Sequence, residues 1–239
     1  MDKKESIMAS IQDEVDRFLF SKLKCNYVRI RSTPGLFDSR PFKWAGYQIE
    51  PHYTYRINLG EGINNVWEQF DRKLRVDINK AIREGVTVEP GNKEDIEFIH
   101  TSLSRRFIEQ GFTPSDHREF LLELYNRFYP ENMKIFIAKY KGEKVGGTIS
   151  LFYKDITFLW VGVPKAELKG ISPNDLVQWE AINWAYNNGC KYYEEMDAGD
   201  DPRLRHFKSK YNPELAIWYT AIKYSSRLYE VGERLIKLV

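Results

Sequence analysis

The sequence contains little cysteine and histidine, with two Cys and four His among its 239 residues. Two cysteines, Cys25 and Cys190, are too few for a disulfide framework, and we expect both to be buried thiols. No apolar run approaches the roughly 18 residues that a membrane-spanning helix needs, and the first residues form no apolar signal segment. We therefore expect a soluble, cytoplasmic protein with no metal framework and no membrane span.

A net charge of one sign is also nearly absent. The 36 basic and 34 acidic residues give a formal net charge of +2, so the molecule as a whole is not expected to attract nucleic acid or membranes. Any basic patch must be local. Hydrophobic residues make up 42% of the chain and aromatic residues 15%, which is enough for a sizeable core in one large domain or two small ones.

The first quarter of the chain predicts a helix and short strands. Residues 4–22 have an apolar residue every three or four positions, which indicates a helix. Its apolar stripe is Ile7, Ile11, Val15 and Phe18. Residues 27–31 alternate and are rich in β-branched side chains, so they predict a strand. Turn-rich residues 33–41 predict a loop, and residues 47–59 carry two short strand signals interrupted by Pro51.

The next part of the chain predicts helices. Residues 64–84 have one apolar face, and Gly85 stands where a helix commonly ends in a left-handed residue. Residues 86–89 predict a short strand. Two further helices have apolar stripes that run from Ile96 to Phe107 and from Phe120 to Phe128.

The second half of the chain predicts strands with one long helix between them. Residues 133–140, 145–153 and 156–163 predict strands that are joined by short turns, which favours an antiparallel meander. Ser172 and Asp175 resemble a capping box, with Pro173 at the first helical position, so a helix is expected from there to Asn188.

The last part of the chain places many ionisable groups after a core strand. A strand is expected over residues 190–196, followed by an acidic loop and then by His206, Phe207 and Lys208. A late strand over residues 215–224 and a final helix over 226–238 complete the pattern. The elements together predict an α+β fold with a mixed, mostly antiparallel sheet flanked by helices. Charged side chains at the end of a core strand commonly form a functional site.

Three blocks of sequence resemble the FemAB-like branch of the GNAT acyltransferases. They are the helix from Arg72 to Val86, the helix from Leu176 to Gly189, and Phe207-Lys208 followed by Tyr211-Asn212. The last block is similar to the branch's Phe-Lys-x-x-Phe-Gly motif, with Tyr-Asn in place of Phe-Gly. The blocks follow the family's order within residues 45–224, and the order of elements from Val86 onward resembles the GNAT fold.

The resemblance implies a division of the chain and a function. FemAB-like proteins carry two GNAT-like halves, so residues 61–239 are expected to form a complete GNAT-like acyltransferase domain. Residues 1–60 would be the reduced remnant of a first half. The implied reaction moves an aminoacyl group from aminoacyl-tRNA, or an acyl group from acyl-CoA, to a primary amine by direct attack.

The expected partners are therefore an acyl donor and an amine acceptor, with tRNA as a candidate donor and no bound cofactor. A Gly-rich turn holds the pyrophosphate in acetyl-CoA-dependent members, but residues 163–173 contain one glycine, and Pro173 lacks an N–H. This favours the FemAB-like branch. A non-catalytic binding module that pairs with another chain, such as a second copy in a homodimer, is the alternative.

The resemblance assigns the chemistry to Phe207 and Lys208. Acyl transfer builds negative charge on a carbonyl oxygen, and one donor aimed at that oxygen contributes about 3–4 kcal/mol. A solvated surface lysine is the alternative interpretation of Lys208. An attacking amine must also lose a proton, and Asp197 at the strand end is the preferred acceptor. Other candidates are Glu194 and Glu195, which should lie on opposite faces of the strand, and Asp200, Asp201 and His206.

A basic helix face is the candidate phosphate site. Arg72, Arg75, Asn79 and Arg83 recur every three or four positions and are flanked by Lys73 and Lys80. Such a stripe can bind the phosphates of CoA or of a tRNA end, although an ordinary solvated helix face has the same pattern. Arg203 and Arg205 add positive charge near Lys208 and either bind an anionic donor or offset the neighbouring aspartates.

Overall fold

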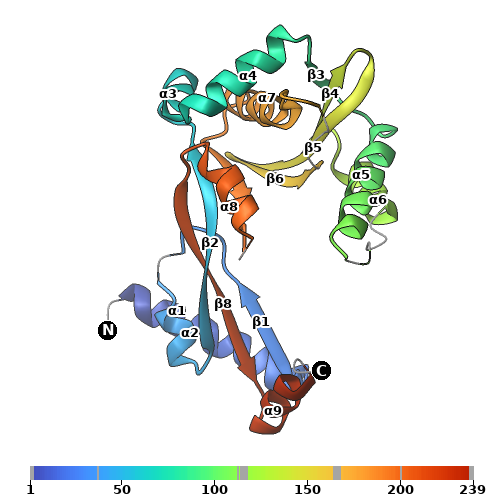
Figure 1. Ribbon diagram of the computed structural model, residues 1–239. Coiled ribbons are helices and arrows are strands. Elements are labelled where there is room, and N and C mark those ends of the chain that lie inside the picture. Colours follow the sequence, from blue (N-terminus) through green and yellow to red (C-terminus); the bar gives the residue numbers. More distant parts are fainter. Residues whose placement is uncertain are drawn as a thin grey trace. The chain divides into compact units, whose positions relative to one another are not determined.

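The computed structural model describes residues 3–36, 38–111, 113, 118–163, 168–199 and 201–236. Residues 233–236 are described by their backbone alone. The chain divides into two compact units. We call residues 1–54 with 215–239 the terminal unit, and residues 55–214 the central unit (Figure 1). The interpretation of residues 1–60 as a remnant of a first GNAT-like half stays a prediction; in the structure, residues 215–239 belong to the same unit as the N-terminal segment.

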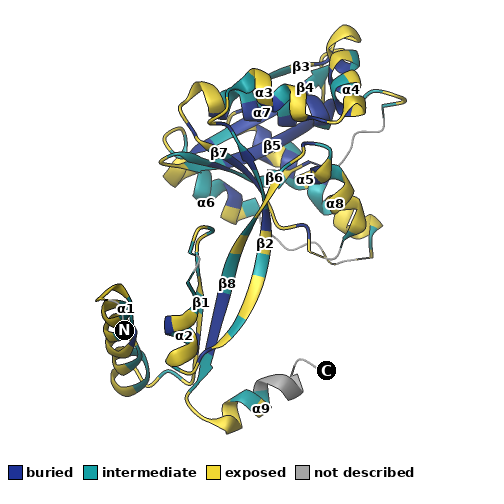
Figure 2. Ribbon diagram, turned by 90° about the vertical axis from the view of Figure 1, so that its left-hand side faces the viewer, coloured by how far each residue is buried: buried dark blue, intermediate teal, exposed yellow. Residues whose placement is uncertain are grey.

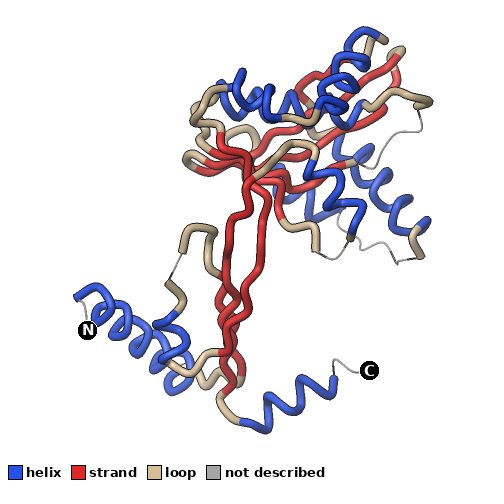
Figure 3. The backbone as a smooth tube through the Cα atoms, turned by 60° about the vertical axis from the view of Figure 1, so that its left-hand side comes forward, coloured by secondary structure: helices blue, strands red, loops and turns tan. Residues whose placement is uncertain are grey.

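The terminal unit combines a three-stranded sheet with helices. Its elements are α1 (Lys3–Asp16), the π-helix η1 (Arg17–Lys22), β1 (Tyr27–Arg31), α2 (Arg40–Trp44), most of β2 (Gln48–Asn58), β8 (Glu214–Tyr224) and α9 (Arg227–Ile236). The strands of this unit are drawn as red tubes in Figure 3. Strand β8 lies between β1 and β2 and pairs with β1 in antiparallel register, with Tyr27 opposite Tyr224. Val28, Tyr47 and Ala221 form its small buried core.

The helix predicted over residues 4–22 is confirmed, but its apolar stripe does not enter a core. Ile7, Ile11, Val15 and Phe18 are each 37–54% exposed, and α1 is coloured mostly as exposed in Figure 2. The stripe that predicts the helix is therefore an apolar surface of the terminal unit. Periodicity in the sequence shows which side chains share a face, and it does not show what covers them.

Three expectations for this segment were wrong. Residues 48–58 form one strand, β2, in place of two short strands. Pro51 is exposed within it, and proline is tolerated in a strand where its missing N–H is not needed. The predicted loop ends two residues early, because the short helix α2 begins at Arg40, with Pro41 in its first turn. Cys25 is half-buried, whereas Cys190 is buried as expected.

The central unit is built on a mixed sheet. Its elements are the end of β2, α3 (Ile63–Gln69), α4 (Arg72–Arg83), β3 (Thr87–Pro90), α5 (Asp95–Glu109), α6 (Arg118–Phe128), β4 (Met133–Tyr140), β5 (Glu143–Tyr153), β6 (Ile156–Gly162), α7 (Pro173–Asn187), β7 (Tyr192–Met196) and α8 (Pro202–Ser209). The strand order is β2–β7–β6–β5–β4–β3. The pairing is antiparallel from β3 to β6 and between β7 and β2, and parallel between β6 and β7. The predicted α+β class with a mixed, mostly antiparallel sheet is confirmed.

Helices cover both faces of this sheet (Figure 1). Ile135 and Ile137 of β4 pack in the core beneath α5 and α6. Phe136 and Ala138 pack in the core beneath α4 and α7. The alternation follows from the period of two in a strand, and it explains why β4 is apolar on both faces. No helix in the described part of the chain is both long and apolar enough to cross a membrane.

The single helix predicted over residues 64–84 was wrong, because the chain breaks between α3 and α4. Phe70 is extended, with ψ at 147°, and its ring packs edge-on against Trp179 and Tyr211. The Asp71 N–H donates to the carbonyl oxygen of Lys210 at 2.9 Å. The helix end at Gly85 is confirmed by a φ of +88°. Tertiary packing of Phe70 therefore overrides a continuous helical pattern.

Two expectations near α7 and α8 were also wrong. Ser172 is the residue before α7, with Pro173 in the first turn as predicted, but its side chain makes no capping bond. Asp175 accepts hydrogen bonds from Lys210 and Tyr211 instead. The predicted loop after β7 contains α8, whose first turn is capped by the Asp201 carboxylate, which accepts the Arg203 N–H at 2.8 Å.

The packing of Gly91 provides a test of the core. A Cβ atom at this position would lie 2.5 Å from Cγ2 of Ile135, which is fully buried. We expect Gly91→Ala to lower the free energy of unfolding by about 1–3 kcal/mol, because the core must shift to admit the methyl group. Gly162→Ala is the matched control, since a Cβ there meets nothing within 4 Å. Equal urea midpoints for the two variants would contradict this packing.

Candidate functional site

The candidate site lies where two parallel strands of the central unit separate. The β6–β7 ladder ends at the pair Phe158 and Glu194, although β6 continues to Gly162 and β7 to Met196. Ligands in sheets of this kind bind beyond the carboxyl ends of neighbouring parallel strands, where the strands diverge. The residues that follow the ladder therefore form the candidate site.

An irregularity in β6 lies at the same position. Ile149 of β5 is opposite Val161, and Ser150 is opposite Leu159, so Trp160 is an extra residue in β6. A bulge of this kind redirects a side chain and is common beside active sites. The half-buried Trp160 ring packs edge-on against Phe120 of α6, with centroids 6.1 Å apart.

Lys208 lies on α8, and its ammonium group is enclosed by the end of β7. The residue is 6% exposed, so it is not a solvated surface lysine. Its Nζ donates to three backbone carbonyl oxygens, those of Glu195 at 2.5 Å, Met196 at 3.0 Å and Asp197 at 2.8 Å. An ammonium group has three N–H donors, and all three are used. An acyl oxygen could bind Nζ only in exchange for one of these carbonyls.

The turn that Lys208 holds is strained. Met196 has a φ of +62°, a left-handed value that a residue with a side chain rarely adopts. Asp197 follows directly, is exposed, and accepts the Gly199 N–H on its carboxylate at 2.9 Å. Three consecutive carbonyls that converge on one cation offset the cost of this turn. Lys208 thus fixes the backbone that presents Asp197.

Burial lowers the pKa of Lys208, and the charges of Glu195 and Asp197 act in the opposite direction. The three carbonyl oxygens accept hydrogen bonds and offer none. Only the ammonium form can satisfy them all. We therefore treat Lys208 as charged at neutral pH.

Glu194 and Glu195 are both buried and lie on opposite faces of β7. The Glu194 carboxylate pairs with Arg56 of β2 at 2.8 Å. Glu195 lies toward α7, where Gln178 Nε2 donates to its Oε1 at 2.9 Å. Its Oε2 has no hydrogen-bond partner among the described residues, and burial raises the pKa of this carboxyl to about 8. The sequence analysis preferred Asp197 to Glu194 and Glu195 as the proton acceptor. Strand alternation places the two glutamates on opposite faces, but it does not show which of them lacks a cation.

A second buried contact joins α8 to the beginning of α7. Lys210 Nζ lies 2.7 Å from Asp175 Oδ1, with side chains 18% and 3% exposed. The Tyr211 hydroxyl donates to the same oxygen at 3.3 Å. The Phe207 ring packs edge-on against Tyr211, and Lys210 Nζ lies over the Phe207 ring, 4.7 Å from its centroid. In the described contacts, the Phe-Lys-x-x-Tyr segment therefore anchors α8 as well as supplying Lys208.

The predicted basic stripe faces away from the core of the central unit. Arg72, Asn79 and Arg83 are exposed on α4, and Arg75 pairs with Glu68 at 2.7 Å. Lys80 is placed differently, because a Cβ on Gly170 would lie 3.1 Å from its Nζ. Lys80 therefore reaches the segment that leads into α7.

The other predicted charges lie at the beginning of α8. Arg203 binds both carboxylate oxygens of Asp201, at 3.1 and 2.9 Å, so it offsets that aspartate. Arg205 and His206 are exposed, and Asp200 lies outside the described residues. The described residues contain no group of three or more His, Cys, Asp and Glu that could hold a metal ion.

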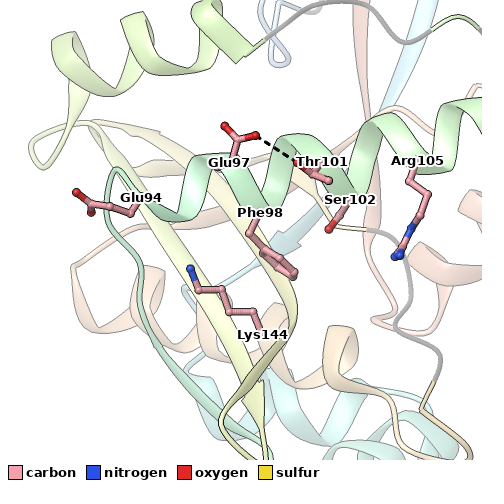
Figure 4. A pocket seen from close by; sticks show the side chains of 7 residues that line it. All are labelled: Glu94, Glu97, Phe98, Thr101, Ser102, Arg105 and Lys144. Atoms are coloured by element: carbon pink, nitrogen blue, oxygen red, sulfur yellow. Dashed lines mark hydrogen bonds between the residues drawn. The ribbon is translucent and has the colours of Figure 1, made fainter.

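A hollow of about 550 Å³ lies along α5 and is separate from these groups (Figure 4). It is lined by Glu94, Glu97, Phe98, Thr101, Ser102, Arg105 and Lys144. Lys144 pairs with Asp95 at 2.5 Å, and Glu97 pairs with Arg118 at 2.6 Å. Its lining includes no residue of β6, β7 or α8, so this hollow does not contain the candidate chemistry.

Comparison with known proteins supports the fold. The family model described as an acetyltransferase (GNAT) domain matches residues 69–209. The solved structure of FemX is 13% identical, covers 90% of this chain and 76% of its own, and has a TM-score of 0.76. No curated protein matched the chain.

Two lysylphosphatidylglycerol synthetase structures also have similar folds. The C-terminal domain of a putative synthetase from Agrobacterium fabrum is 12% identical, with a TM-score of 0.64 over 92% of this chain and 76% of its own. L-PGS from Bacillus licheniformis is 16% identical, with a TM-score of 0.61 over 94% and 77%. Likeness at these identities concerns the fold.

The enclosure of Lys208 can be tested by stability. We expect Lys208→Met to lower the free energy of unfolding by about 2–5 kcal/mol, because three carbonyl oxygens lose their donors. Lys73→Met is the control, since its side chain is 82% exposed in a surface ion pair with Asp77, and a loss of at most about 0.5 kcal/mol is expected. If urea unfolding gave similar losses for both variants, the three-carbonyl contact would be refuted.

Proposed function

Because the acetyltransferase (GNAT) domain model matches more than half of the chain, the chain belongs to that family, and we propose that it transfers an aminoacyl group from aminoacyl-tRNA to a primary amine. Acyl-CoA is the alternative donor. The observation that supports the site most strongly is the separation of β6 from β7 directly beside the enclosed ammonium of Lys208.

The proposed reaction is a direct attack. The neutral amine nitrogen forms a bond to the carbonyl carbon, and the carbonyl electron pair moves to oxygen. The amine proton passes to a base, and the tetrahedral intermediate re-forms the carbonyl as it expels the tRNA ribose oxygen or the CoA sulfur, which takes up a proton from the base or from water. Cys190 is not a good nucleophile candidate, because it is buried and its Sγ accepts a hydrogen bond from Thr157 at 3.2 Å.

The diverging strands offer a place for the acyl arm. Residues 159–162 of β6 lie beyond the β6–β7 ladder, so their backbone groups on that side can pair with an extended ligand. The bulge at Trp160 redirects the strand at this point. The donor carbonyl would then lie near the end of β7.

Lys208 and Asp197 have the proposed catalytic roles. A buried ammonium group acts on a developing oxyanion with little screening by water, and Phe207 holds the helix that carries it. Direct contact with the oxyanion needs one of the three carbonyls to give up its bond. Asp197 is exposed just after the strained turn and is the proposed acceptor for the amine proton.

Phosphates of the donor are assigned to the basic residues of α4 and α8. Lys80 is best placed, because it reaches the segment before α7, and Lys73 lies one heptad before it on the same side of α4. The exposed stripe would add longer-range attraction. Its members are Arg72, Arg75, Asn79 and Arg83. The exposed Arg205 of α8 would act in the same way, whereas Arg203 is paired with Asp201.

A non-catalytic binding module is the second candidate. It is favoured by the apolar stripe of α1, whose four members are at least 37% exposed in the terminal unit. Surfaces of this kind often bind another chain, which includes a second copy. Transfer of a labelled acyl group to an amine would decide for the enzyme.

We expect Asp197→Asn to reduce kcat by about 10²–10⁴-fold, since the amide cannot accept the amine proton. Its fold should be unchanged, because the asparagine side-chain oxygen can still accept the Gly199 N–H. The measurement is single-turnover transfer from labelled donor, with thermal unfolding as the folding check. Wild-type turnover in a folded Asp197→Asn protein would remove Asp197 from the mechanism.

Donor identity can be tested by binding. Charged tRNA should raise the melting temperature, and its affinity should fall with salt. Lys80→Ala should flatten the plot of log affinity against log salt by about 0.7–0.9 per lost phosphate contact. Lys22→Ala, an exposed lysine of η1, is the control and should keep the wild-type slope. A shift with CoA and none with charged tRNA would favour the alternative donor.

A further inference from the structure

Glu195 is a buried acid that the proposed reaction does not use. It is 1% exposed, and its described hydrogen bonding consists of one bond from Gln178 at 2.9 Å. Its second oxygen has no partner, and its carboxyl forms no ion pair, among the described residues. A carboxylate in such surroundings has lost its water without gaining a contacting cation. The geometry therefore favours the protonated, neutral acid.

The neighbouring charges do not reverse this conclusion. Lys208 is the nearest opposing charge, but its three donors are directed at backbone carbonyls. Lys210 is committed to Asp175. Tyr193 and Tyr211 are buried neutral phenols whose pKa values are raised by burial. Burial likewise raises the pKa of Glu195 to about 8. The positive charges of Lys208 and Lys210 and the hydrogen bond from Gln178 act in the opposite direction but do not outweigh burial.

A neutral Glu195 has a consequence for the end of β7. The ammonium of Lys208 then has no nearby side-chain anion within the buried layer, because Asp197 is exposed and turned to Gly199. Its field reaches the diverging strands with little screening. Ionisation of Glu195 would place a negative charge on the side chain of the residue whose backbone carbonyl Lys208 binds, and would cancel much of that field.

We propose that Glu195 is a positioning residue of the transfer site, which in its neutral form leaves the Lys208 ammonium without an anionic partner of its own in the buried layer at the end of β7. Glu195 acts through Lys208 and need not touch substrate. The effect on rate rests on the proposed function, whereas the protonation state of Glu195 does not.

The sign of the stability effect follows from proton binding. A carboxyl whose pKa is raised from 4.5 to about 8 on folding holds its proton in the native state while the unfolded chain has released it. Stability is therefore lost as pH rises between these two values, and no further loss from this group occurs above them. A glutamine at position 195 is neutral at every pH, so Glu195→Gln should abolish this loss of stability with rising pH.

The experiment compares wild-type protein with Glu195→Gln. Between about pH 5.5 and pH 8.5, the melting temperature of the wild type should fall by about 5 °C or more relative to the variant. Glu194→Gln is the matched control on the opposite face of the same strand. It removes the partner of Arg56 and lowers stability, but it retains Glu195 and should keep the wild-type slope.

The transfer rate provides the second readout. At pH values above the titration midpoint of Glu195, the wild-type transfer rate should fall about tenfold per pH unit. The pH–rate profile of Glu195→Gln should lack this descending limb. A purely structural role would lower the rate at every pH without removing the limb. If the melting temperatures of wild type and Glu195→Gln changed equally with pH, the inference would be overturned. Identical pH–rate profiles would also overturn it.

A third measurement covers a variant that fails to fold. In wild-type protein labelled with ¹³C at glutamate carboxyls, one buried signal should titrate with a midpoint above about pH 7. If every glutamate titrates below about pH 6, the inference is wrong. A pH-dependent stability difference without any transfer activity would instead overturn the proposed function and leave the neutral state of Glu195 supported.

Discussion

The hydrogen bonds between the Lys208 ammonium and three consecutive carbonyl oxygens organise the end of β7. They satisfy backbone groups at a turn with a left-handed Met196, and they attach α8 to the sheet. Neither effect needs a ligand. The chemistry proposed for Lys208 is therefore built on a structural contact, and the ammonium can influence a bound carbonyl by its field even while its three protons stay committed.

Charge at this site is governed by burial more than by composition. The chain has a net charge of only +2, yet the layer between α7, β7 and α8 contains two acids and two lysines: Asp175, Glu195 and Lys208 are buried, and Lys210 is half-buried. Asp175 and Lys210 compensate each other directly. Glu195 and Lys208 do not touch through their charged groups, which leaves their protonation states sensitive to each other.

Local sequence patterns predicted β4, β5 and β6 of the central unit well, because these strands are rich in apolar residues and are joined by short turns. Gly85 likewise marks a helix end through a left-handed backbone that favours glycine. The patterns failed where distant contacts decide. Phe70 interrupts a predicted helix because its ring packs on Trp179 and Tyr211. Asp175 accepts a hydrogen bond from Lys210 and does not form the expected capping box.

For the site, the sequence by itself determined the family resemblance, the segment that holds the ionisable groups, and the pairing of Phe207 with Lys208. Tertiary structure decided how these groups act. The ammonium is enclosed by carbonyls, Phe207 packs against Tyr211, and the arginine stripe of α4 points outward while Lys80 approaches Gly170. The physical reason is that desolvation and hydrogen-bond partners depend on residues far apart in the chain, whereas motifs record only neighbours.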